Sequence, residues 1–314
     1  MMDWLLSLLE LVVFVLLAPL FSAWVKRVKC WLQNRRSPSL LQPYRDLRRL
    51  FSKQVIMAEI ASPVFRVTPY IIAGATLMAA AVVPFISVNL PTAAIADVIV
   101  LAGFFALARF FQALAGMDIG TPFGGMGSSR EMTISALAEP AMLMAVFTLS
   151  MVASSTNLSI VIEHLMAQGL VLRPSLFFAL LSLLLVGIAE TGRIPVDNPA
   201  THLELTMIHE AMILEYSGRH LALIEWAVQL KLMIYAVLIA NIFFPWGIAT
   251  TDSMSAIALG AGTLLVKLVL LGGLLAAGET LFAKMRLFRV STFLVLALTL
   301  ALIGLLSHII LEVG

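Results

Sequence analysis

The sequence has little charge and almost no cysteine. Only 12% of its 314 residues are Asp, Glu, Lys or Arg, whereas a soluble domain carries roughly 25%. The single cysteine, Cys30, excludes an internal disulfide framework and any multi-cysteine cluster or zinc site built by this chain. Because 61% of the residues are hydrophobic and the mean hydropathy is +1.02, we predict an all-α polytopic membrane protein, a single integral membrane domain over residues 1–314.

Other absences narrow the class further. The net charge of only +2 argues against a nucleic-acid partner. No internal repeat of the kind found in many secondary transporters is present, which disfavours a free-standing transporter. The first apolar stretch follows Met1, Met2 and Asp3 without a positive charge. We therefore expect a retained first membrane span with its N-terminus outside, and not a cleaved signal peptide.

Apolar stretches near the ~20 residues that a helix needs to cross a bilayer recur along the chain. We predict eight spans, at about 4–25, 67–90, 98–117, 131–153, 174–192, 220–245, 255–282 and 290–311.

Basic residues predict the orientation of these spans. Lys and Arg gather in the first, third, fifth and seventh connections, whereas the even-numbered connections contain only Arg173. By the positive-inside rule both termini lie outside, and the loops 26–66 and 191–219 are cytoplasmic. We expect a multi-pass protein of the cytoplasmic (inner) membrane.

Two connections carry helical patterns of their own. Leu47, Leu50 and Phe51 recur at helical spacing behind Arg45, which predicts an amphipathic helix in the first loop, either a lipid-headgroup anchor or a docking surface for a soluble partner. The outside segment 157–172 predicts a short surface helix with Glu163 and His164 on its solvent side.

Several ionisable residues fall inside predicted spans, where each costs roughly 2.5–3.5 kcal/mol at mid-bilayer. They are Glu10, Arg109, Glu139, Glu190, Glu225, Lys231, Lys267 and Glu279. Arg109 and Glu139 lie at similar depth on consecutive spans, which predicts an intramembrane ion pair. Lys231 and Lys267 are central in their spans and have no obvious acid on the same helix.

The stretch Glu190–Gly218 is the most polar part of the chain, with five carboxylates and two histidines. Clustered acids and imidazoles favour a proton relay. If the segment 199–215 is helical, Glu204 and Glu215 share nearly one face, although Thr201 and Glu204 also fit a capping box. A metal site from His202, His209 and Glu210 is disfavoured, because this histidine spacing is unusual for ligands. We expect no metal site.

Two cytoplasmic motifs give the chain a family resemblance. The run Arg193-x-Pro195-x-Asp197-x-Pro199, with Glu204-Leu205 and Glu215-Tyr216-Ser217-Gly218, resembles the signature loop of the complex I subunit 1 family. The first-loop run Asn34-Arg35-Arg36-x-Pro38-x-x-x-Gln42-x-Tyr44-Arg45-Asp46 is similar to that family's first cytoplasmic loop.

Within this family the chain is more similar to the membrane subunits of energy-converting NiFe hydrogenases, of the formate hydrogenlyase subunit 4 or hydrogenase-4 component C type. The residues that carry this likeness are Tyr44-Arg45-Asp46, Ser129-Arg130-Glu131, Glu139-Pro140, Ser155-Thr156-Asn157 and Phe244-Pro245-Trp246-Gly247. The resemblance implies a non-catalytic subunit that docks the hydrogenase large and small subunits on its cytoplasmic face. It would link them to antiporter-like, proton-translocating membrane subunits, with the NiFe centre and iron–sulfur clusters in those partners.

The chain also departs from the family pattern. Quinone-reducing members carry Glu-x-Glu-x-Glu after the proline, whereas here the run is Ala200-Thr201-His202-Leu203-Glu204. First-loop glycines are replaced by Ser37 and Ser39. These differences favour the hydrogenase reading over the alternative, the quinone-binding subunit 1 of a complex I-like NADH/quinone oxidoreductase.

Two sets of functional residues follow from the polar loop, the buried charges and the resemblance. We expect a proton relay from Glu139, Glu190, Asp197, Glu204, Glu210, Glu215, His202, His209, Lys231 and Lys267. We expect partner docking through Arg35, Arg36, Arg45, Asp46, Arg193 and Tyr216.

Overall fold

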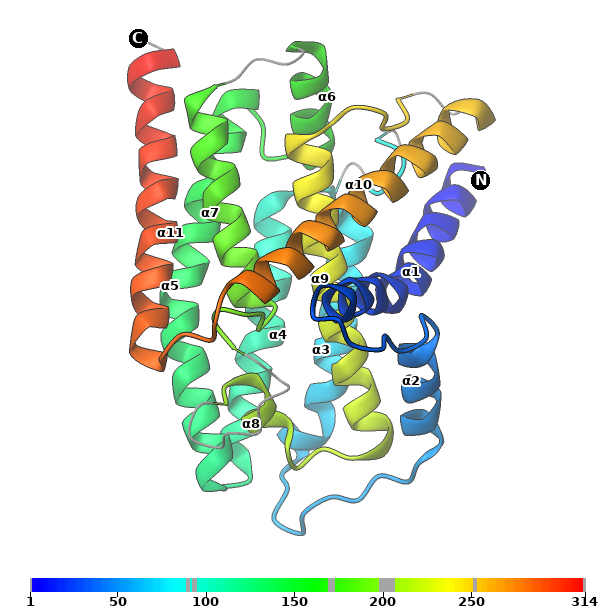
Figure 1. Cartoon of the computed structure of the whole chain (residues 1–314), viewed down its shortest axis with the longest axis vertical. Helices are drawn as coiled ribbons and strands as arrows, with labels where there is room; N and C mark the ends of the chain where they lie inside the picture. The colour runs from blue at the N-terminus through cyan, green and yellow to red at the C-terminus, as the bar shows by residue number, and fades with distance from the viewer. Residues whose placement is uncertain are drawn as a thin grey trace.

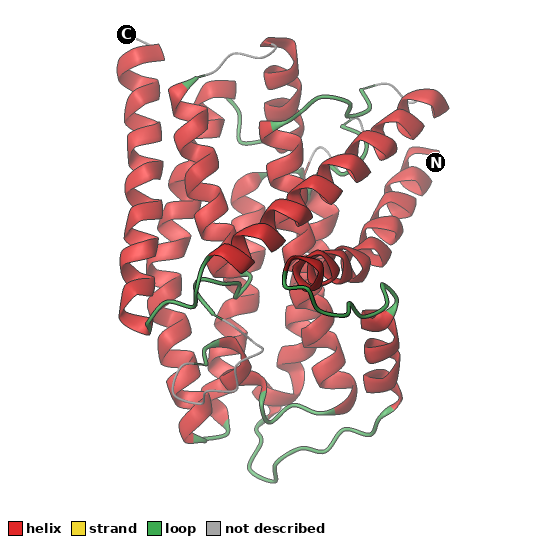
Figure 2. Ribbon diagram, in the orientation of Figure 1, coloured by secondary structure: helices red, strands yellow, loops and turns green. Residues whose placement is uncertain are grey.

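A computed structural model describes residues 2–88, 91, 95–168, 173–197, 207–250 and 253–312. These ranges are helical apart from their connections (Figures 1 and 2). The helices are α1 (Met2–Leu32), α2 (Gln42–Ser52), α3 (Pro63–Val82), α4 (Val98–Asp118), α5 (Pro122–Ala153), α6 (Leu158–Gln168), α7 (Pro174–Glu190), α8 (His209–Ile213), α9 (Gly218–Phe243), α10 (Met254–Leu281) and α11 (Leu287–Ser307), which continues as η3 (His308–Glu312). Extended pairing within these ranges is limited to isolated bridges, Ser87 with Ala249 and Asp97 with Asn157.

The prediction of an all-α polytopic membrane protein is confirmed. Among the described residues, seven helices are long and apolar enough to cross a membrane: α1, α3, α4, α5, α9, α10 and α11. The remaining predicted span, 174–192, coincides with α7, which has 17 residues and stands at the short limit for a crossing helix. It ends at Glu190 because the chain turns through Gly192, whose φ of +58° is left-handed.

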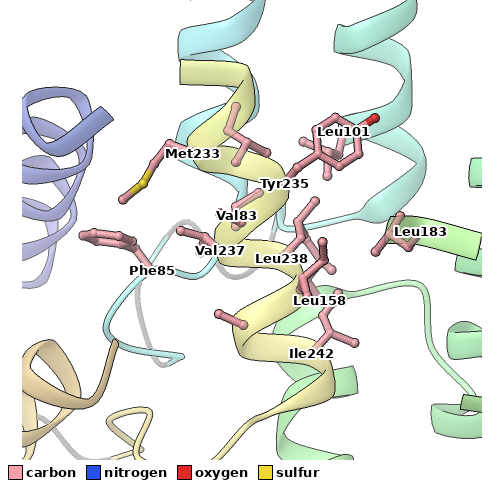
Figure 3. Packing of buried hydrophobic residues seen from close by; sticks show 14 of the residues in the cluster. Val83, Phe85, Leu101, Leu158, Leu183, Met233, Tyr235, Val237, Leu238 and Ile242 are labelled. Carbon is pink, nitrogen blue, oxygen red and sulfur yellow. The ribbon is translucent and has the colours of Figure 1, made fainter. Parts of the chain in front are cut away.

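The central helix of the bundle is α9. Every residue from Leu232 to Ile242 is buried, and a helix that is apolar all round belongs in the interior of a bundle. Figure 3 shows its side chains Met233, Tyr235, Leu238 and Ile242 projecting toward neighbouring elements. Helices α1, α3, α7 and α10 all pack against α9, while α11 packs against α5 and α7.

Both termini lie at one end of the bundle, and α2 and α8 lie toward the opposite end (Figure 1). This arrangement places the first loop together with the connection between α7 and α9. Helix α1 changes direction along its length, and Pro19 inside it removes a backbone donor and accounts for the bend.

The two short predicted helices are both present. α2 is amphipathic, with Leu47 buried and Arg45, Arg48 and Arg49 exposed. α6 buries Val161, Ile162 and Leu165 and exposes Glu163, as its pattern predicts. The helix considered over 199–215 differs, because α8 ends at Ile213 and Leu214 and Glu215 form a turn. Residues 198–206 lie outside the described ranges.

Candidate functional site

Arg109 of α4 is the centre of a buried charge cluster. Its side chain is 4% exposed. Nη1 donates to Glu139 Oε1 at 2.9 Å and to Ser135 Oγ at 2.7 Å, both on α5. Nη2 forms an ion pair with Glu190, the last residue of α7, and Nε lies 3.5 Å from Glu131. The predicted ion pair between Arg109 and Glu139 is therefore one of three ion pairs that Arg109 forms.

Glu190 joins the cluster to the central helix. Its Oε2 accepts a hydrogen bond from Lys231 Nζ of α9 at 2.7 Å as well as pairing with Arg109. Lys231 also lies over the ring of Phe105, 5.6 Å from its centroid. Counted together, the cluster holds two bases and three acids, Glu131, Glu139 and Glu190. The cluster therefore contains one more acidic than basic side chain.

A cavity connects this cluster to the polar loop. It has a volume of about 50 Å³ and is lined by Arg109, Glu131, Glu190 and Lys231 on one side. Asp197 and His209 line it from the loop side. Buried polar walls of this kind can hold bridging waters, which would join titratable groups that do not touch directly.

His209 begins α8 and faces this cavity. Its Nδ1 lies 2.8 Å from Gln112 Nε2 of α4, so that a donating amide leaves Nδ1 as the acceptor. Its buried Nε2 has no hydrogen-bond partner among the described residues. Burial lowers the pKa of the imidazole below its ordinary value, although the nearby Glu210 carboxylate partly opposes this.

Asp197 fixes the start of the polar loop. Oδ1 accepts from Lys284 Nζ at 2.9 Å, and Oδ2 accepts from the Ile208 backbone N–H at 3.3 Å. The Pro195 carbonyl accepts from the Met285 N–H at 2.8 Å. These bonds attach the loop to the connection between α10 and α11, so Asp197 both lines the cavity and holds its wall in place.

Other predicted relay residues lie apart from the cluster. Glu215 is exposed after the end of α8 and does not line the cavity. Glu210 is partly exposed and likewise outside the cavity lining. Lys267 is on α10, which packs mainly on α1 and α9, and it does not line the cavity. His202 and Glu204 fall outside the described residues.

Two predicted docking residues are corrected by the structure. Tyr216 is buried, its ring stacked on Phe65 at 3.9 Å between centroids, and its hydroxyl donates to the Phe65 carbonyl at 3.1 Å. Burial raises the pKa of this phenol well above its ordinary value. Arg193 Nη1 donates to the buried Glu279 at 3.1 Å, and Lys29 binds the same carboxylate at 2.6 Å. The Tyr216 side chain is therefore not on the surface, whereas the Arg193 side chain is 21% exposed and is held by this ion pair.

The remaining predicted docking residues are on the surface of the first loop. Arg35, Arg36 and Arg45 are exposed, and Asp46 is partly buried and accepts from Gln42 Nε2 at 2.9 Å. The described residues contain no group of three or more His, Cys, Asp or Glu side chains that could hold a metal ion.

Sequence reasoning missed Glu131 and Gln112 as site residues. Glu131, Ser135 and Glu139 follow one another at four-residue spacing, which places them along one face of a helix. That spacing was the available signal for Glu131. No sequence signal pointed to Gln112, because its role depends on a contact with His209, which lies 97 residues away in the chain.

Comparisons with known proteins identify the family of this chain. The profile of the family described as NADH dehydrogenase matches residues 6–309. The chain belongs to this complex I subunit 1-like family. It is 33% identical to "Formate hydrogenlyase subunit 4" of Escherichia coli (strain K12), over 89% of this chain and 90% of that protein. It is 34% identical to "Hydrogenase-4 component C" of the same strain, over 89% and 88%.

A more distant sequence relative and a solved structure are also similar to this chain. The chain is 24% identical to an NADH-quinone oxidoreductase subunit of Salinibacter ruber (strain DSM 13855 / M31), over 70% of this chain and 66% of that protein. A chain in the structure of the membrane-bound sulfane sulfur reductase, an archaeal respiratory membrane complex, superposes with a TM-score of 0.81. That match covers 98% of this chain and 99% of the other at 17% identity. The family is thus one of membrane subunits of respiratory and hydrogenase complexes.

Proposed function

We propose that this chain is the membrane-anchoring and proton-coupling subunit of a NiFe hydrogenase complex of the formate hydrogenlyase type, in the cytoplasmic (inner) membrane. It would dock the hydrogenase large and small subunits on the face that carries α2 and α8. It would link their redox chemistry to antiporter-like membrane subunits. The NiFe centre and the iron–sulfur clusters would belong to the partners, and this chain would bind no cofactor of its own.

The observation that carries the proposal is the continuity of titratable groups from the polar loop into the bundle. His209 and Asp197 line the same cavity as Glu131, Glu190, Arg109 and Lys231. A charge change in a redox module above the loop would alter the proton affinity of His209 first. Because Glu190 contacts both Arg109 and Lys231, a change in its charge alters the electrostatic energy of two further charged groups inside the membrane.

In this proposal, Glu139 is the residue through which the cluster passes protons to a neighbouring membrane subunit. It lies near the middle of the 32-residue helix α5, and its side chain is 41% exposed although it contacts Arg109. A carboxylate facing lipid at that depth costs roughly 2.5–3.5 kcal/mol. A membrane partner that covers Glu139 with polar groups would remove this cost. The face of α5 around Glu139 is therefore the expected contact for an antiporter-like subunit.

The docking of a soluble module is supported by the first loop. Arg35, Arg36 and Arg45 are exposed, and α2, which carries Arg45, lies toward the same end of the bundle as α8 (Figure 1). The same arginines can also bind anionic lipid headgroups, so their charge alone does not distinguish docking of a soluble module from anchoring to lipid. Replacing all three with Gln distinguishes them, because loss of the soluble subunits from a still membrane-inserted chain is expected only for docking.

Purification in a mild detergent tests the proposal as a whole. We expect the tagged chain to bring NiFe hydrogenase subunits and antiporter-like subunits with it, together with hydrogenase activity. A chain that purifies alone would contradict the proposal. A set of quinone-oxidoreductase subunits with inhibitor-sensitive, quinone-dependent activity would instead favour the alternative, to which the 24% identical relative points.

A further inference from the structure

A further buried carboxylate is on α1, whose N-terminal end lies toward the same end of the bundle as the C-terminus (Figure 1). Glu10 belongs to the first half of α1 and is 8% exposed. Its Oε2 accepts a hydrogen bond from the Ile86 backbone N–H at 3.3 Å. In the part of the chain that the structure describes, no Lys, Arg or His side chain forms an ion pair with it.

The segment after α3 is held rigidly against Glu10. Asn241 of α9 donates through Nδ2 to the carbonyls of Pro84, at 2.9 Å, and Phe85, at 3.0 Å. The Phe85 ring packs edge-on against Phe14, one helical turn after Glu10, with centroids 5.0 Å apart. Figure 3 shows Phe85 on this segment, beside the central helix. The Ile86 N–H is thus fixed toward the carboxylate by contacts on both sides.

Two serine hydroxyls share a cavity with this carboxylate. Ser87, 3% exposed, follows Ile86, and Ser159, 5% exposed, comes from α6. Both line the same cavity as Glu10, which has a volume of about 200 Å³. Among the described residues neither hydroxyl oxygen has a hydrogen-bond partner. Buried hydroxyls without partners are rare, because each forfeits the hydrogen bonds it makes in water.

The chemistry of this site favours a small positive ion. A carboxylate, two hydroxyl oxygens and room for water form the oxygen-rich set that hard cations bind. The single carboxylate balances one positive charge, whereas a divalent ion would leave an uncompensated charge in an apolar surrounding. We infer that Glu10, Ser87 and Ser159 bind a hydrated monovalent cation, Na⁺ being the representative, from the side of the membrane where the termini lie.

This site is independent of the proposed proton path. Glu10 is on α1 and Ser159 on α6, whereas the cluster around Arg109 is built by α4, α5, α7 and α9. A failure of the cation site would therefore leave the proposed coupling function intact, and the reverse also holds.

Sodium-dependent stabilisation tests the inference on the complete purified complex. Its thermal unfolding midpoint is measured in choline chloride while NaCl replaces choline at constant ionic strength. Because a ligand that binds only the folded state stabilises it, we expect the midpoint to rise with Na⁺ by several degrees. Glu10→Gln should abolish the rise, and the double variant Ser87→Ala/Ser159→Ala should weaken the apparent affinity by about tenfold or more. Glu163→Gln, at an exposed carboxylate of α6, should respond like the wild type.

Two further readouts keep the test independent of how the variants fold. Wild-type complex should retain ²²Na⁺ that unlabelled Na⁺ displaces and choline does not. Its infrared difference spectrum on adding Na⁺ should show a carboxylate signal that Glu10→Gln lacks. The inference is overturned if the wild type shows neither binding nor stabilisation, if Glu10→Gln responds equally, or if the Glu10 band is that of a protonated carboxylic acid whatever the Na⁺ concentration.

Discussion

At the scale of single residues, Arg109 holds together charges that would otherwise repel one another. It contacts Glu131, Glu139 and Glu190, which come from two different helices. Breaking a buried ion pair by removing one partner is far more costly than the pair is stabilising, since the remaining charges stay buried without compensation.

Replacing this guanidinium gives a first prediction. Arg109→Met should destabilise the purified protein by roughly 3–5 kcal/mol, because three carboxyls lose their shared base. A fall in the thermal unfolding midpoint in detergent measures the effect. Arg45→Met, at an exposed position of α2, is the matched control and should leave the midpoint nearly unchanged. Equal midpoints for both variants would show that Arg109 is not holding the cluster.

His209 gives a prediction about pH. Its folded-state pKa lies below the unfolded value of about 6.5, so the folded state binds fewer protons in that range. The free energy of unfolding is therefore undiminished by His209 above about pH 6.5. It declines as the pH falls toward the folded-state pKa, with a slope of up to ~1.4 kcal/mol per pH unit. Midpoints recorded between pH 8 and 5 should fall more steeply for the wild type than for His209→Gln. Parallel curves would contradict this role of the imidazole.

The sequence identifies the charged residues inside the spans, but it does not show which loop residues are buried. Arg109, Glu139 and Glu190 stand out because a charge inside an apolar stretch is costly wherever the helix lies. Tyr216 and Arg193 were assigned to a docking surface because a loop residue carries no periodic signal of burial. Only the packing of Tyr216 on Phe65, and of Arg193 on Glu279 from a helix 86 residues away, decides their environment.

At the scale of elements, the junction between α8 and α9 depends on close approach to the first loop. Gly218 begins α9 with a φ of +53°, and a Cβ there would lie 2.5 Å from the Gln54 carbonyl oxygen. Next to it, the Ser217 hydroxyl donates to the Ile56 carbonyl at 2.7 Å and accepts from the Ile56 N–H at 2.8 Å. The polar loop and the first loop are thus joined at this point.

A glycine substitution tests this junction. Gly218→Ala should destabilise the protein by more than ~1 kcal/mol, because both the positive φ and the contact with Gln54 disfavour a side chain. Gly262→Ala in α10 has open space at its Cβ, and as a helical position it should be neutral or stabilising by up to ~1 kcal/mol. Their unfolding midpoints, compared with wild type, should shift in opposite directions or differ clearly in size. If Gly218→Ala is as stable as Gly262→Ala, the two loops are not locked together here.

The sequence predicts where the helices lie, but it does not predict the residues at which they end. Hydropathy located the helices because a membrane span must be apolar over its whole length, and α2 and α6 followed from their amphipathic patterns. The short end of α7 depends on Gly192, and the early end of α8 depends on tertiary contacts of Ala211 and Met212 with α5. Such contacts join residues far apart in the chain, and no local pattern reports them.

At the scale of the whole molecule, the charges follow the architecture. The helices that carry the cluster surround the cavity beneath the polar loop, whereas α1 and α10 pack on the other side of α9. Lys267 is on that other side, which explains why its central place in the sequence of α10 did not place it with the carboxylates. We therefore expect the side of the bundle formed by α4, α5 and α7 to carry the coupling residues, and α1 and α10 to support α9 from the other side.

The ratio of protons translocated to hydrogen formed, in proteoliposomes that contain the purified complex, tests the central claim most directly. Glu190→Gln, and Glu139→Gln at the partly exposed carboxylate, should lower this ratio to near zero while hydrogen formation continues. Glu163→Gln, an exposed carboxylate outside the cluster, should keep the wild-type ratio. Wild-type ratios in both cluster variants would contradict the account.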